Sequence, residues 1–462
     1  MHKLKFDNLH IVYIIGIGGI GMSALARWFN MIGKRVLGYD RTSTSLTSQL
    51  IEEGINIHFE DSIDNIPKDI ASDKSRVLVV YTPAIPSDHQ ELLYFSDHGY
   101  VIKKRSEVLG IITEQFYTIA VAGTHGKTTT TSIIAHILKS AGKQMVAFVG
   151  GISTNYGSNF IINGDIDNDT IAVVEADEFD RSFLSLNPNV SVVTSLDADH
   201  LDIYGNKNEM EDSFKEFINR TSSEGRLVIN QKVVNNIGEE FLINHKKYSL
   251  DKSEIRAENL KIKEGKFEFD YVNGSGSILG LSLQVPGYHN VENVIAAIAV
   301  TLGLGVSAED IKTAISSYSG VRRRFEYIIR SSKIIFIDDY AHHPVEIESF
   351  LESVRALYPE KQITVVFQPH LYSRTRDFAA EFSKSLSLAD ALILMDIYPA
   401  REEPIPGVSS EIIFENVKIK NKWLLSGSDM INKVSELDPE LLVTIGAGDI
   451  DQFVEPLKLK LS

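Results

Sequence analysis

The sequence predicts an α/β protein with three domains, each built around a parallel β-sheet. Two observations carry this prediction. Apolar runs of strand length alternate with amphipathic, helix-like stretches along the chain, and two glycine-rich turns each stand between such a run and such a stretch. A length of 462 residues fits about three domains of ordinary size, which we place at residues 1–110, 111–319 and 320–462.

The composition excludes several functional classes. The chain has 46 Lys and Arg against 62 Asp and Glu, a net charge of -16, so it lacks the overall basic surface that nucleic acid requires. With no cysteine, it can form no disulfide, no thiolate zinc site and no cysteine nucleophile. The first residues, "MHKLKFDNLH", lack the apolar core that a signal peptide requires, and no apolar run reaches membrane-spanning length. We therefore expect a cytoplasmic protein without membrane insertion, as a monomer or homodimer.

The first domain begins with the apolar run "IVYII" at residues 11–15, the turn Gly16-x-Gly18-x-x-Gly21 and an amphipathic helix. Further apolar runs continue a βαβ rhythm and predict a Rossmann-like sheet. Glycines at the turn let the backbone approach a pyrophosphate, which the amides at the start of the helix would face. The turn therefore predicts a diphosphate ligand without distinguishing a nicotinamide dinucleotide from another diphosphate.

The second domain opens with "AGTHGKTTTT", between the strand-like "YTIAV" and the helix-like "TSIIAHILKSAG". Gly123 and Gly126 allow a nest of backbone amides, Lys127 places a charge on terminal phosphates, and the Thr128 hydroxyl suits Mg²⁺. Val121 stands where the usual ATP loop has its first glycine, so the loop is a shortened variant. The motif predicts ATP binding in a P-loop ATPase-like α/β domain.

Polar groups follow later strands of this domain. Glu175 comes just after the apolar run of "TIAVVEADE", where a carboxylate suits the hard cation Mg²⁺. His200, in "SLDADHLDIYG", is either a structural histidine or part of a second metal or phosphate site. Asn290 and Asn293 stand at the start of an apolar helix, where they suit either a helix cap or recognition of an adenine edge. These alternatives stay open on the residues alone.

The third domain again pairs apolar runs with polar loops and predicts a Rossmann-like α/β fold. Three arginines at residues 322–324 suit either a solvated face or a clamp on a transferring phosphoryl group. His342 and His343 lack the spacing and the cysteine support of a zinc site. A pocket for an amino acid, with an arginine for its carboxylate, explains this region better.

Taken together, the motifs "GIGGIGMSALA", "GTHGKTTTTS", "EADEFDRSF", "DADHLDIYG", "PGYHNVEN", "RRRFE", "DDYAHHPVEI", "FQPHLYSRTR" and "GAGDI" resemble the Mur ligase family, in family order from residue 16 to residue 449. They are most similar to the branch that joins L-alanine to UDP-N-acetylmuramate. The resemblance implies an ATP-dependent ligase of peptidoglycan synthesis that works through an acyl phosphate. It also implies that the first turn holds the diphosphate of a UDP-sugar, and that the third domain closes over ATP by a hinge motion.

The resemblance implies roles for individual residues. UDP-N-acetylmuramate is expected at Gly16, Gly18, Gly19, Ile20, Gly21, Met22 and, near the uridine, Asp40. ATP is expected at Gly123, Thr124, His125, Gly126, Lys127, Thr128, Thr129, Asn290, Asn293, Arg324 and Asp339. Mg²⁺, or Mn²⁺ in its place, is expected at Thr128, Glu175 and His200, and L-alanine at Tyr340, His342, His370 and Arg374. The expected catalytic residues are Lys127, Glu175, His200, Arg324 and His342, the last as the base that deprotonates the amine.

Four alternatives compete with this interpretation. A recycling ligase of the same family adds a preformed tripeptide to the same sugar nucleotide, but its first loop usually departs from "GIGGIGMS". A nicotinamide oxidoreductase would leave the second glycine turn without a function. A non-enzymatic ATP-binding switch would not need the first turn, and neither would folate-type glutamate ligases. The carbamylated lysine of sister ligases is not assigned here, although Lys215 lies near that position.

Overall fold

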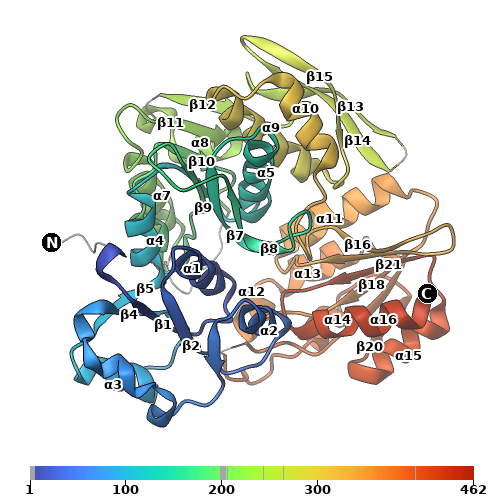
Figure 1. Ribbon diagram of the computed structural model, residues 1–462. Coiled ribbons are helices and arrows are strands. Elements are labelled where there is room, and N and C mark those ends of the chain that lie inside the picture. Colours follow the sequence, from blue (N-terminus) through green and yellow to red (C-terminus); the bar gives the residue numbers. More distant parts are fainter. Residues whose placement is uncertain (1–5, 198–203, 205, 243, 264, 401) are drawn as a thin grey trace. The chain divides into compact units, whose positions relative to one another are not determined.

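The computed structural model describes all residues except 1–5, 198–203, 205, 243, 264 and 401 (Figure 1). The chain divides into two compact units. The first comprises Met1–Arg256, Val272–Ser277 and Asn293–Ile315, and the second comprises Ala257–Tyr271, Ile278–Glu292 and Ser316–Ser462. No helix among the described residues is long and apolar enough to cross a membrane.

The N-terminal sheet is parallel throughout, with the strand order β3-β2-β1-β4-β5. Its strands are β1 (Ile11–Ile15), β2 (Arg35–Tyr39), β3 (Asn56–His58), β4 (Val77–Tyr81) and β5 (Val101–Lys104). Its helices are α1 (Ile20–Met31), α2 (Ser45–Glu52), α3 (Gln90–Asp97) and α4 (Arg105–Thr113). The direction of strand succession reverses between β1 and β4. A crevice at the carboxyl ends of these two strands is where such a sheet binds ligands.

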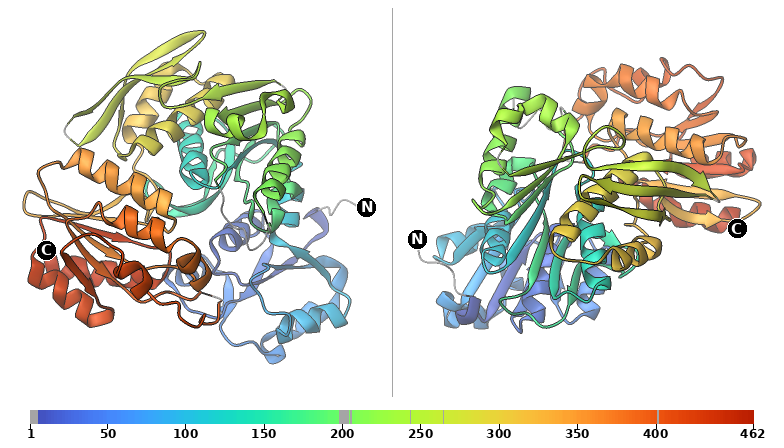
Figure 2. Two further views of the ribbon diagram at one scale, coloured as in Figure 1. Left: turned by 180° about the vertical axis from the view of Figure 1, so that it is seen from behind. Right: turned by 90° about the horizontal axis from the view of Figure 1, so that it is seen from above.

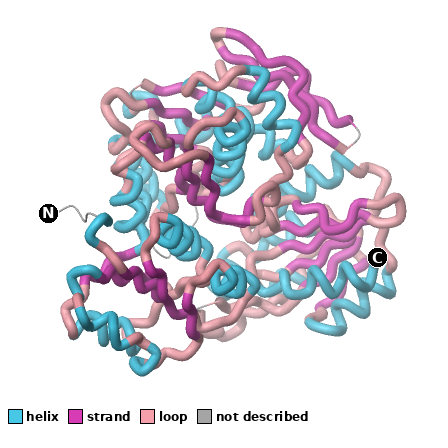
Figure 3. The backbone as a smooth tube through the Cα atoms, viewed as in Figure 1, coloured by secondary structure: helices cyan, strands magenta, loops and turns pink. Residues whose placement is uncertain are grey.

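Both faces of this sheet are covered, which explains why β1 is apolar at successive positions rather than at alternate ones. Val12 and Ile14 pack with residues of α1 and α4, whereas Tyr13 and Ile15 pack with Phe95 of α3. Figure 3 shows helices on both sides of these strands. The apolar run therefore makes β1 a central strand, and the glycine turn lies at the carboxyl end of that strand.

The central sheet has the order β12-β11-β10-β6-β9-β7-β8, and among its described strands only the β7–β8 pair is antiparallel. Its strands are β6 (Tyr117–Ala122), β7 (Met145–Ser153), β8 (Ser158–Asn163), β9 (Ile171–Glu175), β10 (Val190–Val193), β11 (Arg226–Asn230) and β12 (His245–Tyr248).

Helices between and after these strands are α5 (Lys127–Ser140), α7 (Lys207–Asn219), α8 (Gln231–Ile237), α9 (Tyr288–Gly303) and α10 (Ala308–Ser317). The ATP-type loop joins β6, in the middle of the sheet, to α5.

A three-stranded sheet of β13 (Arg256–Lys263), β14 (Lys266–Asn273) and β15 (Gly276–Leu283) separates β12 from α9 in the chain. Its strands alternate buried and more exposed residues, most clearly in β14. This alternation is expected of a sheet with one solvated face.

The C-terminal sheet has the order β16-β17-β21-β18-β19-β20, with β16 antiparallel at its edge. Its strands are β16 (Glu326–Arg330), β17 (Ile335–Asp339), β18 (Ile363–Phe367), β19 (Ala391–Leu394), β20 (Asn421–Leu424) and β21 (Leu441–Ile445). Its helices are α11 (Pro344–Leu357), α12 (Tyr372–Asp377), α13 (Ala379–Leu386), α14 (Glu411–Phe414), α15 (Gly427–Leu437) and α16 (Val454–Leu461). In Figures 1 and 2, α11 covers one face of this sheet and α15 and α16 cover the other. The three predicted parallel sheets are therefore present.

Candidate active site

The first glycine turn is shaped by its backbone and by one carboxylate. Gly16 has a φ of +84°, which favours glycine. The Gly18 amide donates to Oδ2 of Asp40 at 2.8 Å, and a Cβ on Gly18 would lie 2.8 Å from that same oxygen. Asp40, at the end of β2, therefore braces the turn. The position near the uridine that the resemblance implies for this residue stays a prediction.

The ATP-type loop is held equally closely. Gly126 caps α5 in the left-handed region, with φ +82°, and a Cβ there would lie 2.6 Å from Oδ1 of Asn293. A Cβ on Gly123 would meet Oγ1 of Thr194 at 2.1 Å. The His125 amide donates to Oγ of Ser195 at 2.7 Å. Asn293, predicted at the adenine, thus lies against the loop, and both glycines are required by close contacts.

Lys127 is held as a cation inside this loop. Its Nζ donates to the Gly123 carbonyl at 2.7 Å and to Oε1 of Glu178 at 2.8 Å. Burial alone would lower the pKa of Lys127, but the carboxylates of Glu178, Asp177 and Glu175 outweigh burial and raise it. The ammonium therefore stays charged and is directed at the loop that would hold phosphates.

Two predicted metal ligands meet at the end of β9. Oγ1 of Thr128 donates to Oε2 of Glu175 at 2.9 Å, and the Gly150 amide donates to the same oxygen at 2.9 Å. A Cβ on Gly150 would lie 2.2 Å from that oxygen, so only glycine fits beside the carboxylate. A hydroxyl and a carboxylate are the hard oxygen donors that Mg²⁺ prefers, so these residues fit the ion.

The third predicted ligand, His200, lies outside the described residues. Among the residues that the structure does describe, no group of three or more His, Cys, Asp or Glu is arranged to hold a metal ion. Thr128 and Glu175 therefore make up the described part of the predicted magnesium site.

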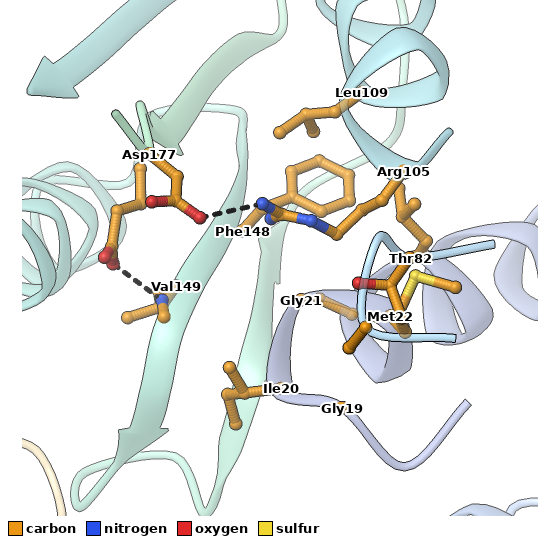
Figure 4. A pocket seen from close by; sticks show the side chains of 15 residues that line it. Gly19, Ile20, Gly21, Met22, Thr82, Arg105, Leu109, Phe148, Val149 and Asp177 are labelled. Atoms are coloured by element: carbon orange, nitrogen blue, oxygen red, sulfur yellow. Dashed lines mark hydrogen bonds and ion pairs between the residues drawn. The ribbon is translucent and has the colours of Figure 1, made fainter. Parts of the chain in front are cut away.

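A cavity of about 340 Å³ lies between the first glycine turn and the carboxylates that follow β9 (Figure 4). On one side it is lined by Gly19, Ile20, Gly21 and Met22, from the start of α1. On the other side it is lined by Phe148, Val149 and Gly150 of β7 and by Glu175 and Asp177 after β9. Arg105, at the start of α4, reaches into it and donates to Asp177 at 3.0 Å. The predicted diphosphate site and the predicted metal ligand thus share one space.

Asn290 has a structural bond of its own. Its buried side-chain amide donates to the Pro286 carbonyl at 2.7 Å, one turn earlier in the chain. This bond supports the structural interpretation of Asn290. Its contact with adenine stays a prediction.

In the second unit, the structure separates the roles of two neighbouring arginines. Arg323 donates through Nε to Asp338 at 3.1 Å and through its guanidinium to the Gly446 carbonyl at 2.6 Å, so it joins β17 to β21. Arg324 is about one third exposed, with its guanidinium 5.0 Å from the Tyr340 ring centre and 3.9 Å from Glu346. Arg324 is therefore the cation better placed to bind a ligand.

Asp339, at the end of β17, is fixed by backbone amides. Its carboxylate accepts from Phe325 at 2.7 Å and from Ala341 at 2.8 Å. Burial raises its pKa to about 6, although Arg324 acts in the opposite direction. The carboxylate therefore holds two loops together at the strand end, whatever ligand it also meets.

Three of the four residues predicted for L-alanine gather at the ends of β17 and β18. The ring centres of Tyr340 and His342 are 5.3 Å apart, and those of His342 and His370 are 6.0 Å apart. Nδ1 of His342 is 3.0 Å from the Tyr340 carbonyl. Arg374 lies on α12, with its side chain buried. The structure thus brings Tyr340, His342 and His370 together, whereas their role as an amino-acid pocket stays a prediction.

Comparison with known proteins identifies the family. Residues 11–117 match the domain described as "Mur ligase family, catalytic domain", residues 121–301 match "Mur ligase middle domain", and residues 323–448 match "Mur ligase, glutamate ligase domain". A protein of Flavobacterium psychrophilum named UDP-N-acetylmuramate–L-alanine ligase is 49% identical over 99% of both chains. The chain belongs to the Mur ligase family.

Further relatives agree with this Mur ligase assignment. A protein of the same name from Cytophaga hutchinsonii is 43% identical over 99% of this chain and 98% of its own. The crystal structure of UDP-N-acetylmuramate–alanine ligase from Thermotoga maritima is 27% identical, has a TM-score of 0.80, and covers 96% of this chain and 97% of its own. The three-domain α/β fold predicted from the sequence is confirmed.

The geometry of this Mur ligase also contains residues that the sequence analysis missed. Arg105 and Gly150 both line the cavity, and neither belongs to a glycine-loop or acidic motif. Arg105 follows directly after β5, at the carboxyl edge of a parallel sheet, and this position was the available signal. Gly150 gave no local signal, because its role depends on Glu175, 25 residues away.

Proposed function

We propose that this Mur ligase joins L-alanine to the lactyl carboxylate of UDP-N-acetylmuramate in an ATP-dependent reaction of peptidoglycan synthesis. One observation carries the choice of substrates. Curated relatives that are 43–49% identical over nearly the whole chain bear the name of that activity. The cavity that the first glycine turn shares with Glu175 supports the proposal, because the reaction must bring a sugar nucleotide to the metal-bound phosphates of ATP.

The chemistry proceeds in two displacements. A carboxylate oxygen of UDP-N-acetylmuramate attacks the γ-phosphorus of ATP, and the bond to the β–γ bridging oxygen breaks to give an acyl phosphate and ADP. The amine nitrogen of L-alanine then attacks the acyl carbon and loses a proton to a base. The carbon–oxygen bond to phosphate breaks, which releases inorganic phosphate and leaves the amide.

The residues of the chain would divide this work among themselves. Lys127 and Arg324 would offset negative charge on the transferring phosphoryl group. Thr128 and Glu175 would hold Mg²⁺, which neutralises phosphate charge when bound. His342, among the aromatic residues at the end of β17, would accept the proton of the amine.

The decisive experiment measures phosphate release from ATP and Mg²⁺ with UDP-N-acetylmuramate, and confirms the product by mass. L-alanine, glycine, L-serine and the tripeptide L-Ala-γ-D-Glu-diaminopimelate are compared as amine substrates. Release that requires both the sugar nucleotide and L-alanine supports the proposal. Turnover with the tripeptide alone would assign the recycling activity instead, and no turnover with any amine would contradict both.

The structural similarity to recycling ligases does not favour that alternative. A murein peptide ligase from Psychrobacter arcticus has a TM-score of 0.70 but is only 23% identical, so it shares the fold. A cytoplasmic location and a monomeric or dimeric state stay predictions from the sequence.

A further inference from the structure

The cavity between the first glycine turn and Glu175 has more negative than positive side chains. Two carboxylates, Glu175 and Asp177, line it, and Arg105 is the one cation among its described lining residues. When bound, Mg²⁺ would offset the charge of Glu175, which leaves Asp177 as the carboxylate that a substrate carboxylate entering this cavity would meet. Such a contact between two anions is unfavourable unless a cation accompanies it.

Arg105 is placed to supply that cation. It begins α4 directly after β5, and in Figure 4 its side chain extends across the cavity towards Asp177. Its NH2 group donates to Oδ2 of Asp177 at 3.0 Å, and the side chain is about one quarter exposed. The guanidinium is therefore anchored by one contact and still open to the cavity.

The same guanidinium lies beside the turn that is predicted to hold the diphosphate. Its NH1 group would lie 2.7 Å from a Cβ on Gly21, so the glycine is what leaves room for it. A ligand whose diphosphate sits on the turn would thus bring its next groups within reach of Arg105. Arginine binds carboxylates through two parallel hydrogen bonds, which fix orientation as well as charge.

We propose that Arg105 binds the lactyl carboxylate of UDP-N-acetylmuramate and exchanges Asp177 for it when the substrate enters. This inference rests on the proposed function, since it assigns the group that holds the carboxylate to be phosphorylated. Arg105 then determines specificity as well, because UDP-N-acetylglucosamine carries no lactyl carboxylate and gains nothing from the guanidinium.

The test compares ligands that differ in the carboxylate. Binding of UDP-N-acetylmuramate, UDP-N-acetylglucosamine and UDP is measured by calorimetry for the wild type and for Arg105→Ala and Arg105→Lys. We expect Arg105→Ala to weaken UDP-N-acetylmuramate by about 10- to 100-fold, the usual worth of a charged hydrogen-bond pair. The two ligands without the carboxylate should change by less than about twofold, and Arg105→Lys should fall between.

Two further variants test the direction of the effect on ligand affinity: one at Asp177, expected to act opposite to Arg105→Ala, and one at Lys104, expected to have no effect. Asp177→Asn removes the competing anion, so it should tighten UDP-N-acetylmuramate several-fold and leave UDP unchanged. Lys104→Ala removes the adjacent cation, which pairs with Asp180 and does not line the cavity, so all three ligands should bind as they do to the wild type.

The outcomes separate this inference from the function on which it rests. An equal loss of all three ligands in Arg105→Ala would mean that the arginine only shapes the glycine turn, and would overturn the inference. Weaker binding of UDP-N-acetylmuramate to Asp177→Asn would overturn the exchange. A wild type that gains no affinity from the lactyl group, and shows no turnover with L-alanine, would instead contradict the proposed function.

Discussion

At the scale of single residues, the space beside Glu175 is the most exacting feature of the proposed magnesium site. Gly150 has an ordinary extended position in β7, so alanine is compatible with its backbone, but a Cβ would lie 2.2 Å from the Glu175 carboxylate. We expect Gly150→Ala to displace that carboxylate and to lower kcat about 100-fold, since a shift of about 1 Å in a catalytic group costs this much. Steady-state phosphate release at saturating substrates measures the effect.

Gly276 offers a matched control on β15. A Cβ there would meet no atom within 4 Å, and its φ is not positive. Gly276→Ala should therefore leave kcat unchanged. If Gly150→Ala retains wild-type kcat while Gly276→Ala does too, the carboxylate of Glu175 is not required in its present position.

Asp339 makes the stability of the second unit depend on pH. Burial raises its pKa from 3.8 to about 6, so between these values the folded protein holds a proton that the unfolded chain has released. The free energy of unfolding therefore falls as pH rises through this window, and levels off above pH 6. Two pKa units correspond to about 3 kcal/mol, which we take as the order of magnitude of the loss.

The measurement uses the two tryptophans of the chain, Trp28 and Trp423. In a Trp28→Phe background, the fluorescence of Trp423 on β20 reports urea unfolding of the second unit. The free energy of unfolding is compared from pH 4.5 to 7.5 between the protein that keeps Asp339 and the Asp339→Asn variant. The stability difference between the two proteins should change across this range in favour of the Asn variant. A constant difference would show that the Asp339 carboxyl titrates with an ordinary pKa.

At the scale of elements, a buried amide attaches α1 to the central domain. Asn159 of β8 is fully buried, donates to the Ile20 carbonyl and to Oγ of Ser23 at 2.9 Å, and accepts from Arg27 at 2.5 Å. Asn159→Ala leaves these three groups without that partner and should lower the free energy of unfolding by about 2 kcal/mol. Because α1 carries the glycine turn, KM for UDP-N-acetylmuramate should rise as well.

Asn163 on the same strand separates this effect from a general weakening of β8. Its amide donates only to the Lys143 carbonyl, inside the central domain. Trp28 lies on α1, and urea unfolding followed through it should show a smaller loss in the free energy of unfolding for Asn163→Ala than for Asn159→Ala. Steady-state kinetics should show no change in KM for Asn163→Ala. Equal effects of the two variants would contradict a specific role for the β8 contact with α1.

The elements themselves were largely predictable, because their signals are local. Apolar runs before "GIGGIG" and "GTHGKT" became β1 and β6, and each glycine turn begins the expected helix. Residues that act across the chain could not be found in this way. Arg105 pairs with Asp177 72 positions away, and Asn159 forms hydrogen bonds with α1 at separations of 132 to 139, so only the fold reveals them.

At the scale of the whole molecule, the predicted ligands divide between two units with separate apolar cores. One core around α1 and β10 and another around Tyr13 belong to the first unit, whereas the core around Phe336 and Leu442 belongs to the second. All residues predicted for UDP-N-acetylmuramate lie in the first unit. A ligand that binds only one folded unit stabilises that unit alone unless the two unfold together.

We therefore expect UDP-N-acetylmuramate to shift one of two unfolding transitions. At about 100 times its Kd it should stabilise the first unit by about 2.7 kcal/mol, seen through Trp28 in a Trp423→Phe protein. The transition of Trp423, in a Trp28→Phe protein, should stay where it is, because none of the residues predicted for this ligand belongs to its unit. Equal shifts of both transitions would show that the two units unfold as one cooperative molecule. A shift of the Trp423 transition alone would mean that the sugar nucleotide binds the second unit, which would contradict the prediction.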